Sequence, residues 1–107
     1  MIPWTTPTFT LTVKGVDLTA HEVYADFAQG TKTLHVAAAS TTYDGTDTTV
    51  TVELTQAQTG KFAADKPVAV QVNWITADSK RDATEPKQID NGRNLYEREL
   101  EYGSDNA

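Results

Sequence analysis

Few residues in this sequence are of the types that carry out catalysis, and their spacing matches no catalytic or metal-binding motif. The two histidines, His21 and His35, fall at the start of one predicted strand and on the polar face of another. Even with help from Asp26 or Glu53, they lack the ligand spacing of a zinc site. We therefore interpret both histidines as surface residues and predict neither a metal nor a cofactor.

A nucleophile for hydrolysis is equally unsupported. No Gly-x-Ser-x-Gly elbow is present, and Ser40 and Ser79 fall in predicted loops without a nearby base. Carboxylates such as Asp44 and Asp65 stand at predicted turns, where their usual role is to accept backbone hydrogen bonds. The absence of cysteine excludes disulfides and thiol nucleophiles. We predict that the protein is not an enzyme and keep a small hydrolase as the weakest alternative.

Two loops resemble ligand-binding motifs without completing them. Asp44-Gly45-Thr46-Asp47 is similar to the start of a calcium loop, but no bidentate glutamate follows at the required position. The sequence Asn-Gly-Arg-Asn at 91–94 has one glycine and no Gly-rich strand-to-helix pattern. We expect a bend there, not a phosphate-binding loop.

The net charge of -6 argues against a nucleic-acid or anionic-membrane surface, since either would need clustered Lys and Arg. No apolar run approaches the roughly 20 residues that a membrane-spanning helix requires. The first residues lack the basic start and apolar core of a signal peptide. These features predict a protein that is made in the cytoplasm of its host and used or assembled there.

Alternation of apolar and polar residues predicts that strands dominate the chain. Thr8 to Val13 places Phe9, Leu11 and Val13 on one face and threonines on the other. The segments 23–28 and 32–38 alternate in the same way and predict a hairpin around Gly30. The other predicted strands are 48–54, 68–76 and a last one around 83–89, where Pro86 favours an edge position.

One short helical turn is predicted between the strands. Thr55 and Gln58 have the spacing of a capping box, while Gly60 and Pro67 limit the helix to one or two turns. We predict an all-β, antiparallel, immunoglobulin-like sandwich of about six to seven strands, with neighbouring strands paired in a meander that has one crossover at the helical turn. It occupies residues 1–100, and the acidic tail 101–107 is expected to be disordered.

Apolar residues outside the strands mark a candidate interaction surface. Trp4 lies in a proline-flanked segment, where its ring either covers one end of the core or contacts a partner. Trp74, in contrast, is in phase with three valines and is expected in the core. A short amphipathic helix over 95–100 would present a second apolar patch. The candidate surface comprises Trp4, Arg93, Leu95, Tyr96 and Leu100.

Three groups of segments together resemble a known class of proteins. They are 1–3 with 5–10; 27–30 with 54–56; and 70–74 with 77–78 and 92–95. This order is similar to short proteins encoded in tail and baseplate gene clusters of phages and prophages of Gram-positive bacteria. The second half is also similar to the N-terminal β-sandwich domain of upper baseplate proteins. Position 91, where valine is usual before the glycine, and the acidic tail depart from the pattern.

The resemblance implies a virion structural protein of the tail, neck or baseplate, and it brings no catalytic residues with it. The expected partners are other virion or tail-assembly proteins or a second copy of the chain, and the expected location is the host cytoplasm and then the virion. The alternative is a carbohydrate- or ligand-binding sandwich that uses Trp4, Tyr24 or Tyr43 as stacking platforms.

Overall fold

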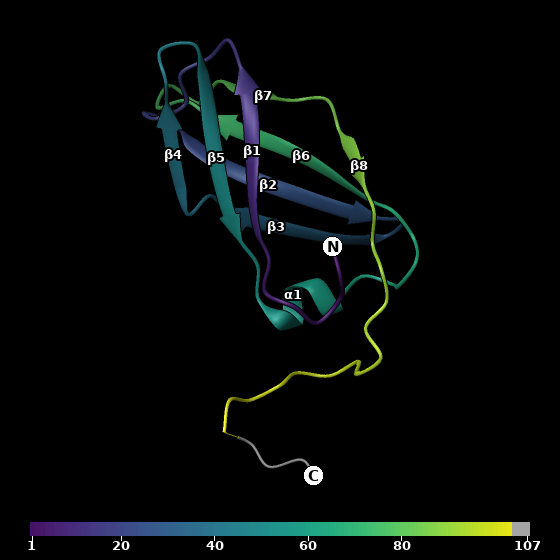
Figure 1. Cartoon of the computed structure of the whole chain (residues 1–107). Helices are drawn as coiled ribbons and strands as arrows, with labels where there is room; N and C mark the ends of the chain where they lie inside the picture. Colours follow the sequence, from purple (N-terminus) through teal and green to yellow (C-terminus); the bar gives the residue numbers. More distant parts are fainter. Residues whose placement is uncertain (104–107) are drawn as a thin grey trace.

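The alternating segments form the strands that their pattern predicts. The computed structural model describes residues 1–103. In chain order the elements are β1 (Thr8–Lys14), β2 (Glu22–Gln29), β3 (Lys32–Ala37), β4 (Ser40–Tyr43), β5 (Asp47–Glu53), α1 (Gln56–Gly60), β6 (Val68–Ile75), β7 (Arg81–Ala83) and β8 (Lys87–Ile89) (Figure 1).

These strands form two antiparallel sheets that pack face to face. The smaller sheet has the order β1-β5-β4, and the larger has the order β3-β2-β6-β7, with β8 also paired to β6. In Figure 1 the strands of the two sheets cross steeply. In immunoglobulin lettering, the two orders correspond to B-E-D and C′-C-F-G. The predicted all-β antiparallel sandwich is therefore confirmed, with eight strands in residues 1–103 where six to seven were expected. The position that strand A would take beside β1 holds no strand in these residues.

Three details of the predicted topology were wrong. The meander is absent, because β1 pairs with β5 and β2 with β6, and a single meandering sheet would leave one apolar face uncovered. Strand β4 was missed, since Ser40 to Tyr43 is short and shows no apolar alternation. The last strand is divided into β7 and β8, because the Val72 amide donates to the Thr84 hydroxyl at 3.1 Å instead of to the Thr84 carbonyl. That carbonyl accepts from the Gln71 side chain at 2.8 Å.

The core lies between the sheets. Phe9 of β1 contacts Phe27 of β2 across them, with ring centroids 5.7 Å apart, a contact that contributes about 0.5–1.5 kcal/mol beyond its buried area. Trp74 is half-buried and packs against this core from its margin. The buried hydrophobic residues are Val13, Leu18, Val23, Ala25, Phe27, Val50, Val52, Leu54, Phe62, Val68, Val70 and Val72.

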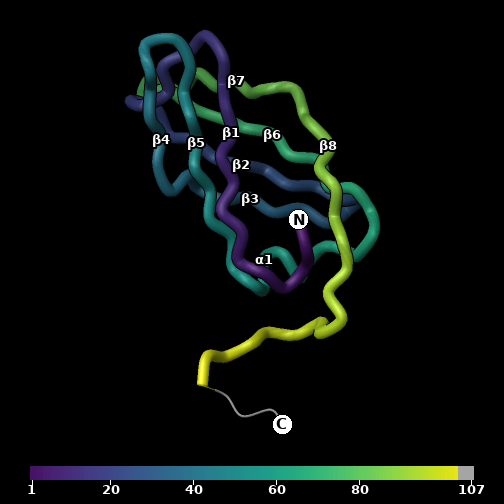
Figure 2. The backbone as a smooth tube through the Cα atoms, in the orientation of Figure 1, coloured from purple at the N-terminus to yellow at the C-terminus, as the bar shows by residue number. Residues whose placement is uncertain are grey.

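The capping box at the start of α1 is formed as predicted. The Thr55 hydroxyl accepts from the Gln58 amide at 3.2 Å, and the Gln58 side chain accepts from the Thr55 amide at 2.8 Å. This short helix lies beneath the sandwich, at the end where the N-terminal segment and the last described residues are found (Figures 1 and 2). No helix in residues 1–103 has the length and apolar character needed to span a bilayer.

Candidate interaction surface

The N-terminal segment and the segment 90–94 are joined beside α1. The Met1 ammonium donates to the carbonyl of Asp90 at 2.6 Å, and the Gly92 amide donates back to the carbonyl of Met1 at 2.7 Å. The Asn94 side chain donates to the carbonyl of Pro3 at 3.0 Å. These contacts hold the N-terminal segment 1–7 and the segment 90–94 against each other, as the backbone trace shows (Figure 2).

Trp4 covers the helix and keeps part of its ring accessible. It has a left-handed backbone conformation, with φ 66°, and its indole lies directly over Gly60. The next residue anchors this turn: the buried Thr59 hydroxyl accepts from the Thr5 amide at 3.0 Å and donates to the Thr5 carbonyl at 2.7 Å. The half-buried Trp4 ring packs on α1 and is not among the residues packed against the core, so its role toward a partner stays a prediction.

Arg93 forms an ion pair at the rim of this region. Its guanidinium contacts the Asp65 carboxylate through Nε at 2.9 Å and Nη2 at 2.8 Å. The Asp65 amide donates to the carbonyl of Gly92 at 3.2 Å, so the pair reinforces a backbone contact. Both side chains are more than half exposed, and water and salt screen their attraction. The pair therefore orients the segment more than it stabilises the fold.

The segment after Asn94 carries the most exposed apolar side chains of this end. The exposed fractions of Leu95, Tyr96 and Leu100 are 95%, 43% and 59%. The amphipathic helix expected over 95–100 is absent. Six residues form too short a helix to be stable alone, and here the Tyr96 amide bonds the Asn94 side chain instead.

The backbone of Leu100 is held by the Gln56 side chain, which bonds both its amide and its carbonyl, as a neighbouring strand would. Its amide donates to Oε1 of Gln56 at 2.6 Å, and its carbonyl accepts from Nε2 of the same side chain at 2.8 Å. Gln56 is the first residue of α1, so this contact brings Leu100 to the helix. The tail 101–107 was expected to be disordered. Residues 104–107 of this tail lie outside the described chain, while Glu101 to Gly103 are described and exposed.

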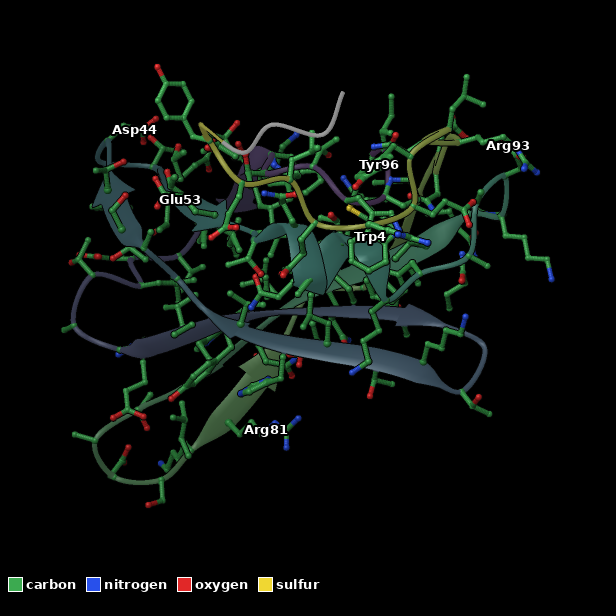
Figure 3. The ribbon with its side chains drawn as sticks, turned by 90° about the horizontal axis from the view of Figure 1, so that it is seen from below. Trp4, Asp44, Glu53, Arg81, Arg93 and Tyr96 are labelled. Atoms are coloured by element: carbon green, nitrogen blue, oxygen red, sulfur yellow. The ribbon has the colours of Figure 1, made fainter. Side chains whose placement is uncertain are left out.

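We call Trp4, Arg93, Leu95, Tyr96 and Leu100 the terminal surface. Figure 3, which views the molecule from the α1 end, shows Trp4, Arg93 and Tyr96 on this side, whereas Arg81 projects from the far sheet. Ile2, with 47% of its area exposed, lies in the same N-terminal segment and was missed. Its position in a proline-flanked segment outside the alternating strands was the signal that could have identified it.

A second arrangement, which the sequence did not reveal, crosses the outer face of the larger sheet. His35 on β3 bonds Asp26 on β2 at 2.5 Å, and the other Asp26 oxygen accepts from Asn73 on β6 at 2.7 Å. Arg81 on β7 donates to the Asn73 side chain at 3.2 Å. Tyr24 stacks on His35 with ring centroids 4.4 Å apart. This polar row ties four strands together.

In the polar row, Asp26 and His35 are paired like the carboxylate and imidazole of a catalytic triad, but no nucleophile is bonded to them in residues 1–103. No hydroxyl in residues 1–103 is hydrogen-bonded to the His35 ring, which acylation by a Ser or Thr would require. Ser40, expected in a loop, begins β4 and shares a shallow hollow of about 440 Å³ with His21, but no hydrogen bond joins them. Within the described chain, no three or more His, Asp or Glu residues are grouped to hold a metal ion.

Comparison of the chain with models of protein families, with curated proteins and with solved structures gave no match.

Proposed function

We propose that this protein is a non-enzymatic structural component of a phage or prophage tail, neck or baseplate, and that it acts through protein–protein contacts at the terminal surface. The resemblance of its segments to tail-cluster proteins supports the biological setting. The arrangement of the two chain ends supports the mode of action.

The observation that carries the proposal is the exposure of Leu95 in a segment that is otherwise specifically held. Asn94 is bonded to Pro3 and Leu100 to Gln56, yet between them the Leu95 side chain is 95% exposed. Burying a leucine side chain gains about 1.5–3 kcal/mol, and a clustered exposed set of apolar residues is typical of a surface that a partner covers. Trp4 and Tyr96 add the aromatic groups that are enriched in such interfaces.

The ligand-binding alternative has weaker geometric support. Two of its three stacking platforms are engaged within the chain, because Trp4 packs over Gly60 and Tyr24 stacks on His35. Tyr43, with 41% of its area exposed, retains a face for a sugar ring. A glycan array tests this alternative: no bound glycan would exclude it, and binding lost in Tyr43→Ala would favour it over the proposal.

The experiment is light scattering after size-exclusion chromatography, with the chain alone and mixed with purified proteins encoded beside its gene. The proposal predicts a complex that Leu95→Asp and Tyr96→Ser weaken. Tyr43→Ser is the matched control, because Tyr43 and Tyr96 are nearly equally exposed, at 41% and 43%. A monomer that binds none of these proteins, or a complex that Tyr43→Ser weakens as much as Tyr96→Ser, would contradict the proposal.

A further inference from the structure

The edge strand β1 borders a groove with an apolar floor and polar sides, which lies where an immunoglobulin sandwich would have a further strand. β1 ends the order β1-β5-β4, so every second residue turns its backbone N–H and C=O away from β5. A groove of about 400 Å³ runs between β1 and the β7–β8 region, with Leu11, Val70 and Val72 among its lining residues. In the immunoglobulin arrangement, strand A occupies this side of the equivalent strand.

The same chain contains a segment with the pattern of a strand that is not in a sheet. From Tyr96 to Tyr102, apolar side chains alternate with Glu97, Glu99 and Glu101, except that Arg98 takes one position of the apolar face. This is period-two alternation with one apolar and one acidic face. Leu100 and Tyr102 are exposed by 59% and 108%.

We infer that this segment of one copy adds as a strand to β1 of a second copy, antiparallel to it, as strand A would. The inference rests on the proposed function and deepens it by naming a partner. The apolar side chains of the added strand must face the core, as those of β1 do. Only registers that differ by two residues satisfy this requirement, because a shift of one residue turns every side chain to the other face. One register places Leu100 opposite Leu11 and Tyr102 opposite Phe9.

Charge complementarity favours the same register. This register places Glu97 opposite Lys14, and opposite charges in directly paired positions stabilise a sheet. Lys14 and Lys87 both line the groove, in a chain whose net charge is -6. Glu85, which also lines it, offers a carboxylate to Arg98. One glutamate of the arriving strand therefore faces a lysine directly, and Lys87 adds a second positive charge to the groove.

The chain's own segment cannot reach this position. Asn94 is bonded to Pro3, which precedes the start of β1, whereas Lys14 ends the strand. Six residues of strand separate Thr8 from Lys14 by about 20 Å. The three residues from Asn94 to Glu97 span at most about 11 Å. A second copy must therefore supply β1, and two copies that exchange their segments reciprocally form a closed dimer, whereas one-way addition builds rings or filaments.

Disulfide trapping tests this contact cleanly, because the natural chain has no cysteine. Thr12 and Glu99 face each other in the inferred register, at a separation that permits a disulfide. Mixing Thr12→Cys with Glu99→Cys under mild oxidation should give a covalent dimer in several-fold excess over a mixture of Thr33→Cys with Glu99→Cys. Thr33 is the matched control, since it is exposed on the other sheet's edge strand β3.

Equal trapping at Thr12 and Thr33, no trapping, or an intramolecular disulfide in a Thr12→Cys/Glu99→Cys double variant would overturn the inference. A charge exchange provides a second measurement: Lys14→Glu and Glu97→Lys should each reduce trapping, and mixing the two variants should restore it. If the chain binds tail proteins but is not trapped, the strand exchange is wrong and the proposed function stands. If it is trapped but binds no tail protein, self-association holds and the proposed function fails.

Discussion

The indole of Trp4 lies against the backbone of Gly60 so closely that no side chain fits between them. A Cβ placed on Gly60 would lie 2.4 Å from Cδ2 of the ring. The glycine is the last residue of α1 and packs under the tryptophan that begins the terminal surface. This contact packs the N-terminal segment against the helix.

Gly60→Ala should therefore destabilise the protein, by about 1–3 kcal/mol for an overpacked site. Helix propensity alone predicts the opposite sign, because alanine is favoured over glycine by up to about 1 kcal/mol. Urea unfolding measures the change in the free energy of unfolding. Gly92→Ala is the control, because its Cβ would meet Ile2 at an ordinary 3.5 Å. Unchanged or increased stability in Gly60→Ala would show that Trp4 is not seated there.

Thr59 anchors the same segment through a buried hydroxyl that serves both polar groups of the Thr5 backbone. Thr59→Val keeps the shape of the side chain but leaves the Thr5 amide and carbonyl without their partner. We expect a loss of about 1–3 kcal/mol in the free energy of unfolding, as for buried polar groups left unpaired. Thr10→Val on the exposed face of β1 should cost far less. Equal costs would contradict the anchoring role.

Gln56 is expected to control the mobility of the segment around Leu100. Gln56→Glu replaces the amide donor to the Leu100 carbonyl with an acceptor and breaks one of the two hydrogen bonds. Hydrogen exchange at Leu100 should accelerate, while global stability changes little, because the contact is exposed. Gln58→Glu, which keeps the capping oxygen, is the control. Unchanged exchange at Leu100 in Gln56→Glu would show that this contact does not hold the segment.

The turn before β5 makes a pH-dependent contribution through Asp44. Hydrogen bonds from the amides of Asp47 and Thr46 hold the pKa of this carboxyl below its ordinary 3.8. A lowered folded-state pKa contributes stability above the unfolded value, and this contribution is lost as pH falls below about 3.8 through the folded pKa. Asp44→Asn should therefore lower the melting temperature at pH 6 and have less effect at pH 2. Equal effects of Asp44→Asn at both pH values would contradict this.

Elements with a local signal could be predicted from the sequence. The strands around Phe9 and Val70 follow from alternation over several residues, and α1 follows from the capping pair Thr55 and Gln58. Strand β4 could not be predicted, because it is short and has no apolar alternation, and the break at Thr84 could not, because it depends on pairing with β6. The order of strands in the two sheets could not be predicted either, because it follows from which apolar faces meet across the core.

The terminal surface was predictable in part. Apolar residues outside the strand pattern identified Trp4 and Leu95, but nothing local indicates that Met1 bonds Asp90, 89 residues away. The polar row through Asp26 and Asn73 was missed for a related reason. Its members become neighbours only when β3, β2, β6 and β7 are set side by side.

The central claim is that this chain is a structural part of a phage particle. It is tested most directly by quantitative mass spectrometry of particles purified on a density gradient from the strain that carries the gene. The account predicts the chain in intact particles, at a constant ratio to the major tail protein, and particles without normal tails when the gene carries Leu95→Asp with Tyr96→Ser. Complete, infectious particles that lack the chain would contradict it.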